Sequence, residues 1–157
     1  MSQLYYHLQA EDEYRYQDWE KRVYRRHIEA MYADFEQGVT SGVVYALGSD
    51  LIGYPTHPQD HAPKEFELAV QHGMTPMQAI VAGTSTSAQA LGLGEAIGTL
   101  EAGKIADMVG VVDDPLEDIT TLQRVAFVMH RGEVIVNRLV ESPERGSRLE
   151  VRVGRTS

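Results

Sequence analysis

The strongest hydrophobic signal in the chain is an unbroken apolar run at residues 43–47, which is followed by Gly48, Ser49 and Asp50. A run of this length is too short to be one face of a helix, and it is typical of a strand buried on both sides. We therefore predict a buried strand of an α/β fold at 43–47. Because parallel α/β folds keep their functional sites at the carboxyl ends of strands, Asp50 is the first candidate for a functional residue.

A long helical pattern precedes this strand. Over residues 11–37 apolar side chains recur at spacings of three and four, which predicts one amphipathic helix whose apolar and aromatic side chains belong to the core. Gly38 stands where a glycine is expected to end such a helix. The order helix, short turn and strand makes an αβ unit.

Proline and capping signals organise the region after the strand. Residues 51–64 contain three prolines, which predicts a loop that leaves the same end of the strand as Asp50. A helix is expected at 65–72. Thr75 is expected to cap a second helix at 76–82, because a proline and then a glutamine follow it at the usual spacing. A third helix is expected to start at Thr84 or Ser85 and to end near residue 92.

The pattern changes to short β-like runs beyond Gly94. These predicted strands are punctuated by glycine and proline, and they lie at residues 97–100, 108–112, 125–129 and 134–136. Residues 130–133 predict a tight hairpin turn between the last two runs. Asp107 is expected to organise a turn. Residues 141–157 are charged and polar, and an edge strand at 149–153 and a disordered tail are both compatible with them.

Composition excludes several classes of function. The chain has 157 residues and a formal net charge of -9, so we expect no nucleic-acid partner, since duplex-binding modules usually carry a basic face. It has no cysteine, which excludes disulfides, thiolate metal ligands and a cysteine nucleophile. No apolar run approaches a membrane span and the first residues do not resemble a signal peptide, so we expect no membrane partner and a cytoplasmic location.

Four motifs follow one another along the chain. They are Ala-Leu-Gly-Ser-Asp at 46–50, the helical motif at 73–80, the segment at 97–109 and the stretch from Asp114 through the hairpin to Asn137. In this order they resemble one known family, the metal-dependent amidohydrolase superfamily, in its imidazolonepropionase-like and Xaa-Pro dipeptidase-like branch. The motif at 46–50 is similar to that family's last-strand motif, and the resemblance covers about residues 38–137.

The resemblance implies a fold, a reaction and a role for Asp50. The family's fold is a (β/α)8 TIM barrel with a small β-sandwich built from both chain ends. Its members hydrolyse carbon–nitrogen bonds of small amide or dipeptide-like substrates at a divalent metal, for which zinc is the expected ion here. Asp50 would be the last-strand aspartate, which binds the metal and takes a proton from the metal-bound water.

The sequence departs from the family in its length and in its metal ligands. A whole barrel takes about 250 residues, whereas this chain has 157. No two of its histidines lie two apart, so the family's His-x-His motif is absent. We therefore interpret residues 1–93 as the helix–strand–helix end of the barrel, 94–140 as the C-terminal β-sandwich module and 141–157 as a polar tail. Such a fragment is expected to be inactive alone and to bind no metal tightly.

Two histidines in the predicted loop are candidates for contact with substrate. His57 and His61 lie four apart and close to Asp50 in the sequence, but the neighbouring prolines disfavour a helix that would make them a metal pair. The alternative for both is a solvated loop position, and the alternative for Asp50 is a turn cap, because Gly-Ser-Asp is ordinary turn chemistry. His72 is expected at a helix C-terminus. The hydroxyls at 84–87 are expected to cap a helix.

The sequence leaves two functions open. The first is the C-terminal part of a hydrolase that needs the missing barrel strands, from a longer chain or from a partner. The second is a non-catalytic structural or oligomerisation module, in which the exposed flank of the predicted strand pairs with a second copy or with another partner.

Overall fold

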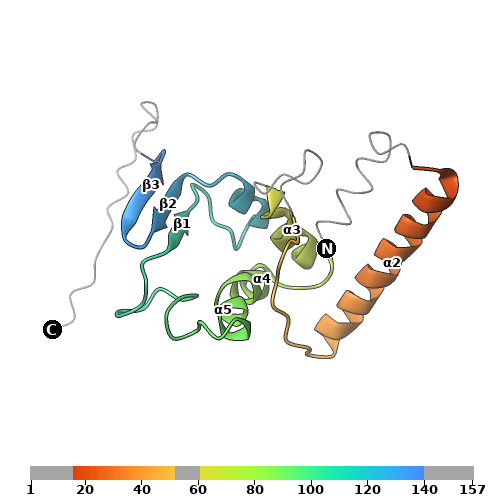
Figure 1. Ribbon diagram of the computed structural model, residues 1–157, viewed down its shortest axis with the longest axis horizontal. Helices are drawn as coiled ribbons and strands as arrows, with labels where there is room; N and C mark the ends of the chain where they lie inside the picture. Colours follow the sequence, from red (N-terminus) through yellow and green to blue (C-terminus); the bar gives the residue numbers. More distant parts are fainter. Residues whose placement is uncertain (1–15, 52–60, 140–157) are drawn as a thin grey trace.

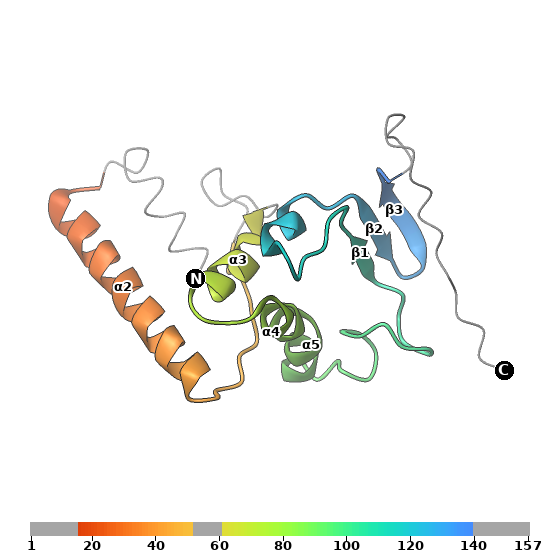
Figure 2. The ribbon, with the colours of Figure 1, turned by 180° about the vertical axis from the view of Figure 1, so that it is seen from behind.

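The computed structural model describes residues 16–51 and 61–139, which form a long helix, a cluster of short helices and a small sheet (Figure 1). His57, most of the predicted loop and the tail at 141–157 lie outside the described residues. The helix cluster lies in the middle, between the long helix α2 and the sheet, and the opposite view shows the same order (Figure 2). None of the helices in these ranges is long and apolar enough to cross a membrane.

The predicted long helix is present as α2, Asp18–Thr40, but it begins later than predicted, since residues 16 and 17 are not helical. Its first turn is held by the Glu20 carboxylate, which accepts a hydrogen bond from the Gln17 backbone N–H at 2.7 Å. Ile28 and Phe35, seven residues apart, are its buried side chains. Trp19 is 60% exposed, so the expectation that its indole belongs to the core is wrong. Figure 1 gives the reason, because the N-terminal half of α2 lies away from the other described elements.

The end of α2 differs from the prediction that Gly38 terminates it. The helix continues through Gly38 to Thr40, with Ser41 as its C-cap, and Gly42 makes the left-handed turn at φ 76°. Gly38 serves a different purpose. A Cβ atom at this position would lie 1.8 Å from the hydroxyl oxygen of Tyr45, so the glycine lets the Tyr45 ring lie against the helix.

The predicted buried strand at 43–47 is wrong for this chain. The segment is extended, but it belongs to no sheet of the described residues, and Val43 and Val44 are 53% and 81% exposed. Burial on both sides requires neighbouring strands and a second layer, and the described residues cover the segment on one side only. Leu47 packs against the helix cluster and Leu51 is buried, so the segment is anchored near its C-terminal end.

The helix cluster follows the predicted order with one correction. Helix α3 is Lys64–Gln71, α4 is Pro76–Val81 and α5 is Ser87–Ala90. Thr75 is the N-cap of α4, as predicted: its hydroxyl accepts from the Gln78 N–H, and its own N–H donates to the Gln78 side chain at 2.8 Å. The predicted new helix start at Thr84 or Ser85 is wrong. The chain instead continues from α4 to α5 through a π-helical turn at Ala82–Thr86.

The buried centre of the molecule joins α2 to this cluster. Its members are mostly small or flexible side chains, and they are Phe35, Ala69, Met74, Ala79 and Ala82. Three alanines in this set allow the backbones of the short helices to approach closely. The 3₁₀ helix Ile119–Gln123 packs against α3 and buries Ile119 and Thr121.

The sheet contains three of the four predicted strands. They are β1 (Met108–Gly110), β2 (Phe127–His130) and β3 (Glu133–Asn137), antiparallel in the order β1-β2-β3, with a bulge between Val128 and Met129. The fourth predicted run, at 97–100, is a turn. Gly98 has φ 95° there and lies against the helix cluster, which is incompatible with a strand. A second sheet layer is not among the described residues, so the sandwich stays a prediction.

The predicted hairpin turn is confirmed, and Asp107, which directly precedes β1, holds it. Arg131 and Gly132 both have positive φ, 51° and 84°, as a two-residue turn of this kind requires. The Asp107 carboxylate accepts a hydrogen bond from the Arg131 N–H at 2.7 Å and lies 3.0 Å from Nδ1 of His130. The expected turn-organising role of Asp107 is therefore confirmed.

Candidate functional site

Asp50 lies at the C-terminal end of the extended segment, and its side chain is exposed to solvent. Its φ is 53°, in the left-handed region, which few residues other than glycine adopt but in which aspartate is enriched. It stands between two anchored leucines, because Leu47 packs on the helix cluster and Leu51 is buried. The exposed carboxylate is therefore held between two fixed points of the chain, and Arg131 in the hairpin turn has a similar φ of 51°.

The two histidine candidates are placed only in part. His61 is exposed and lies in the turn that leads into α3, whereas His57 is outside the described residues. Between residues 16 and 51 and between 61 and 139, no three histidine, aspartate or glutamate side chains come close enough to hold a metal ion. A catalytic metal usually has three protein ligands. The donors that the structure describes therefore do not form a metal site by themselves.

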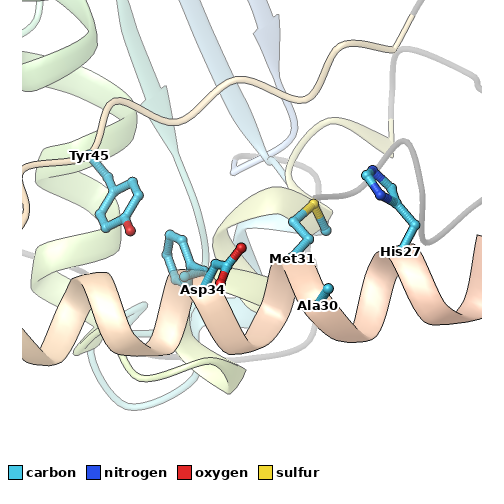
Figure 3. Close-up of a pocket in the computed structure, with 6 residues that line it drawn as sticks. His27, Ala30, Met31, Asp34 and Tyr45 are labelled. Atoms are coloured by element: carbon cyan, nitrogen blue, oxygen red, sulfur yellow. The ribbon is translucent and has the colours of Figure 1, made fainter.

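A hollow of about 440 Å³ lies between α2 and the extended segment (Figure 3). The side chains of Met31, Asp34 and His27 project from α2, and the Tyr45 ring comes from the extended segment on the other side. Its remaining lining residues are Ala30 and Phe35. The helical prediction placed these residues on α2 but did not indicate a hollow. The Tyr45 ring packs on Phe35 at one end of the hollow, with ring centroids 4.6 Å apart.

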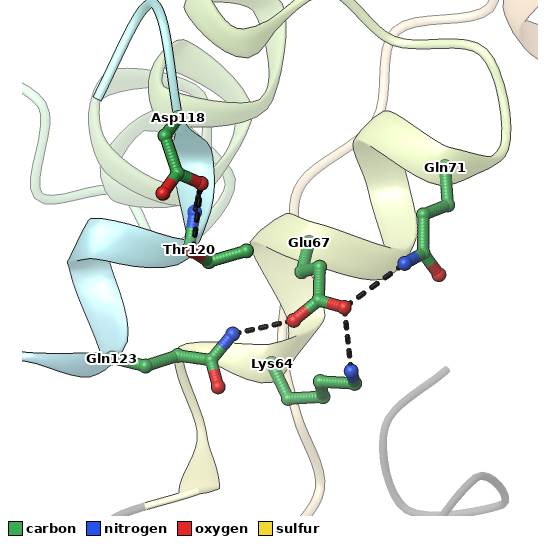
Figure 4. A network of polar contacts seen from close by, with 6 residues as sticks. All are labelled: Lys64, Glu67, Gln71, Asp118, Thr120 and Gln123. Carbon is green, nitrogen blue, oxygen red and sulfur yellow. Dashed lines mark hydrogen bonds and ion pairs between the residues drawn. The ribbon is translucent and has the colours of Figure 1, made fainter. Parts of the chain in front are cut away.

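Glu67 is the centre of a polar cluster on α3 (Figure 4). Its carboxylate accepts hydrogen bonds from Lys64 at 2.6 Å, from Gln71 at 2.9 Å and from Gln123 at 2.5 Å. Burial raises the pKa of Glu67, but the bonds from Lys64, Gln123 and Gln71 outweigh it and hold the pKa below its usual value. The cluster ties α3 to the 3₁₀ helix. The spacings 64–67 and 67–71 are helical pair spacings, which could have indicated it from the sequence.

Asp118 has a comparable local role next to this cluster. Its carboxylate accepts bonds from the hydroxyl and the backbone N–H of Thr120, at 2.7 and 2.9 Å, and so caps the 3₁₀ helix. These two bonds lower the pKa of Asp118. Figure 4 shows both carboxylates satisfied by neighbours within the fold, which favours structural roles.

The predicted position of His72 at a helix end is confirmed, since it is the C-cap of α3. Its ring stacks on Tyr32 with centroids 3.8 Å apart, and its Nδ1 lies 2.7 Å from the Glu36 carboxylate. Both partners belong to α2. His72 therefore connects the short helices to the long one.

Comparison with known proteins assigns these elements to a family. A model of the amidohydrolase family matches residues 4–135. The chain is 34% identical to an ochratoxinase of Aspergillus niger over 98 residues, which are 61% of this chain and 19% of that protein. It is also 34% identical to an imidazolonepropionase of Thermoplasma volcanium over 115 residues, 71% of this chain and 28% of that protein.

A solved structure gives the same result. A Xaa-Pro dipeptidase with bound methionine in its active site matches with a TM-score of 0.62 at 33% identity, over 68% of this chain and 25% of that one. The chain thus spans between 19% and 28% of the length of these relatives. The fold is accordingly a mixed α/β part of the TIM-barrel type that these enzymes share. From the motifs at 46–50, 73–80 and 97–109 and a match over most of its length, the chain belongs to the amidohydrolase family.

Proposed function

We propose that this chain supplies the last strand and the C-terminal part of a barrel hydrolase that cleaves carbon–nitrogen bonds of small amide or dipeptide-like substrates. Family membership and relatives named as an imidazolonepropionase and a Xaa-Pro dipeptidase support the reaction class. Residues 1–93 correspond in this proposal to the end of the barrel, and residues 94–140 to the sandwich module.

The observation that carries the proposal is an exposed carboxylate at the end of an extended segment whose apolar side chains are also exposed. Asp50 ends an extended stretch whose Val43 and Val44 side chains are solvent-exposed although they are apolar. Neighbouring barrel strands would cover these side chains and place other active-site groups around Asp50. The non-catalytic alternative explains the exposed valines equally well, and a turn cap would account for an aspartate at φ 53°. Family membership is therefore what favours the catalytic function.

In this proposal Asp50 moves a proton. A carboxylate beside the attacking water can accept its proton and pass it to the leaving amine, which contributes about 10²–10⁴-fold to the rate in enzymes that use general acid–base catalysis. Its exposed position leaves the carboxylate accessible to a substrate. His57 and His61 are proposed to contact the substrate, because both precede α3 in the segment that follows Asp50.

The metal is a separate part of the proposal. One carboxylate does not hold zinc at useful affinity, so the remaining ligands would come from the missing barrel strands. We expect the isolated chain to show no submicromolar, stoichiometric zinc binding by calorimetry. Tight binding that Asp50→Ala abolishes would contradict this expectation and would indicate a complete site within the chain.

Complementation tests the proposal. The chain is co-expressed with an imidazolonepropionase truncated before its last strand, and the purified assembly is assayed with small amide and Xaa-Pro dipeptide substrates. We expect hydrolysis that falls about 10²-fold or more with Asp50→Asn. Asp113→Asn is the matched control, because it removes another exposed carboxylate and should leave the rate unchanged.

Two results would count against the enzymatic function. One is equal hydrolysis by assemblies with Asp50 and with Asn at this position. The other is a stable, stoichiometric assembly that hydrolyses none of these substrates, which would favour the non-catalytic module.

A further inference from the structure

The π-helical turn at Ala82–Thr86 lies against the segment that carries Asp50. The backbone N–H of Leu47 donates a hydrogen bond to the Ala82 carbonyl at 3.2 Å. Figure 1 shows the segment after α2 passing beside the short helices at this level. Single π-turns inside α-helices occur frequently at functional sites.

The Ser87 hydroxyl adds a contact to the carbonyl of the same residue, Leu47. Its oxygen lies 3.1 Å from the Leu47 carbonyl oxygen and 2.7 Å from the Ala82 carbonyl oxygen. A serine hydroxyl has one proton, so the two carbonyls share it. Both backbone polar groups of Leu47 are thereby held, one by Ala82 of the turn and the other by Ser87, which directly follows the turn. Leu47 is three residues before Asp50.

Close packing fixes the turn itself. A Cβ atom at Gly83 would lie 2.4 Å from the ring of Phe66 on α3, and one at Gly98 would lie 3.1 Å from both the Ser85 Cα atom and the Thr84 carbonyl oxygen. Helix α3 and the loop at 98 therefore both pack closely against the turn. The turn therefore has little room to move, and its contacts with Leu47 hold the extended segment in place.

We infer that Ser87 is a positioning residue for Asp50: its hydroxyl and the π-turn set the register of the extended segment and thereby the place of the carboxylate. This inference rests on the proposed function for its catalytic consequence, but its structural part can be tested in the chain alone. Loss of the hydroxyl frees the Leu47 carbonyl, and the loosened segment then lets Asp50 leave its position.

Amide hydrogen exchange of the full chain, read residue by residue by NMR, tests the structural part. Ser87→Ala removes the bond to the Leu47 carbonyl, so the segment loosens and the bond from the Leu47 N–H to the Ala82 carbonyl opens more often. We therefore expect exchange at the Leu47 amide to be about 3- to 10-fold faster. Exchange in the β2–β3 ladder should stay unchanged. Ser85→Ala is the matched control, because Ser85 lies in the turn, two residues before Ser87, and its hydroxyl faces the Val81 carbonyl at 3.5 Å.

A second pair of variants keeps the test decisive if Ser87→Ala does not fold. Ser87→Thr keeps the hydroxyl and should keep slow exchange at the Leu47 amide. Ser87→Val has the shape of threonine without the hydroxyl, and exchange at the Leu47 amide should become faster. Equal exchange at Leu47 in these two variants, or in wild type and Ser87→Ala, would overturn the inference.

The catalytic part is read in the complemented assembly. We expect Ser87→Ala to lower kcat about 10-fold with little change in KM, because a small misplacement of a reacting group lowers the rate more than it lowers binding. An unchanged kcat would overturn the link to Asp50. If the wild-type assembly is inactive while exchange at Leu47 responds as expected, then the proposed function fails and the anchoring by Ser87 stands.

Discussion

The imidazole of His72 stacks on the phenol ring of Tyr32, with centroids 3.8 Å apart and planes inclined by 19°. The same imidazole places Nδ1 2.7 Å from the Glu36 carboxylate. Tyr32 and Glu36 are one helical turn apart on α2, and His72 ends α3, so one side chain fastens two elements that are far apart in the sequence. This contact gives the long helix a polar attachment beside the apolar one at Phe35.

We expect His72→Ala to lower the free energy of unfolding by about 1–2 kcal/mol, because it removes one hydrogen bond and one ring contact. Urea unfolding followed by circular dichroism measures the change. His27→Ala is the control, since His27 is an exposed histidine of α2, and it should stay within about 0.5 kcal/mol of wild type. Equal losses in the two variants would show that the attachment contributes nothing.

The lowered pKa of Glu67 predicts a pH dependence of stability. A carboxyl group whose pKa is lower in the folded chain stabilises the fold above its unfolded pKa, about 4.3 for glutamate, and loses this contribution as pH falls through the folded value. The carboxylate stabilises the fold at pH 7 through bonds from Lys64, Gln71 and Gln123. We therefore expect Glu67→Gln to be less stable than wild type at pH 7, by about 1 kcal/mol after allowance for its partly open surroundings.

The difference between wild type and Glu67→Gln should shrink as pH falls below about 4.3. Urea unfolding at pH 7, 5 and 3.5 measures it. Gln123→Ala removes one of the bonds that lower the pKa and should show part of the effect, whereas Gln37→Ala, an exposed glutamine of α2, should show none. A constant difference at all three pH values would contradict the assignment.

Local signals in the sequence predicted local structure well. The Thr75 cap, the hairpin at 130–133 and the turn role of Asp107 are confirmed, because each depends on residues whose spacing is set by one turn or one strand pair. The family was also recognisable, since its motifs are short and ordered along the chain.

Features that depend on distant partners could not be predicted in the same way. The apolar run at 43–47 has the pattern of a buried strand, but the described residues provide no neighbouring strand, and Val44 is 81% exposed. The π-turn was missed because Thr84 and Ser85 look like cap residues, whereas their hydroxyls bond to carbonyls four residues earlier. Trp19 is exposed for a similar reason, because the N-terminal half of α2 lies away from the other described elements.

Gly98 and Gly103 offer a matched pair for testing how tightly the π-turn is packed. Both have nearly the same positive φ, 95° and 94°, so an alanine at either position has the same backbone strain of about 1–2 kcal/mol. Only at Gly98 would the new Cβ meet other atoms, at 2.6 Å from Cβ of Ala88 and 3.1 Å from the Thr84 carbonyl oxygen. We expect Gly98→Ala to lose a further 1–3 kcal/mol or so relative to Gly103→Ala.

Thermal or urea unfolding of both variants measures this excess. If the site is crowded, Gly98→Ala loses more free energy of unfolding than Gly103→Ala, and the NMR shifts of the residues around Ala88 change. Equal losses of stability in the two variants would mean that the loop can move away from the helix cluster. This result would also weaken the inference that the turn holds Leu47 in place.

The backbone at Asp50 predicts which substitutions separate function from folding. Asparagine adopts the left-handed region more readily than most residues, so Asp50→Asn should stay within about 0.5 kcal/mol of wild type in stability. Valine is β-branched and fits poorly at φ 53°, so Asp50→Val should lose roughly 1–2 kcal/mol. Thermal unfolding resolves this loss, because 1 kcal/mol shifts the Tm of a chain of this size by about 2–4 °C.

The same two substitutions at Asp113, which is exposed and has no positive φ, serve as controls and should both be close to neutral. If Asp50→Asn keeps the Tm but removes hydrolysis from the complemented assembly, the loss belongs to the carboxylate and not to the fold. If Asp50→Val is as stable as Asp113→Val, the backbone at Asp50 carries no strain. Its unusual φ would then no longer support a residue held in place for catalysis.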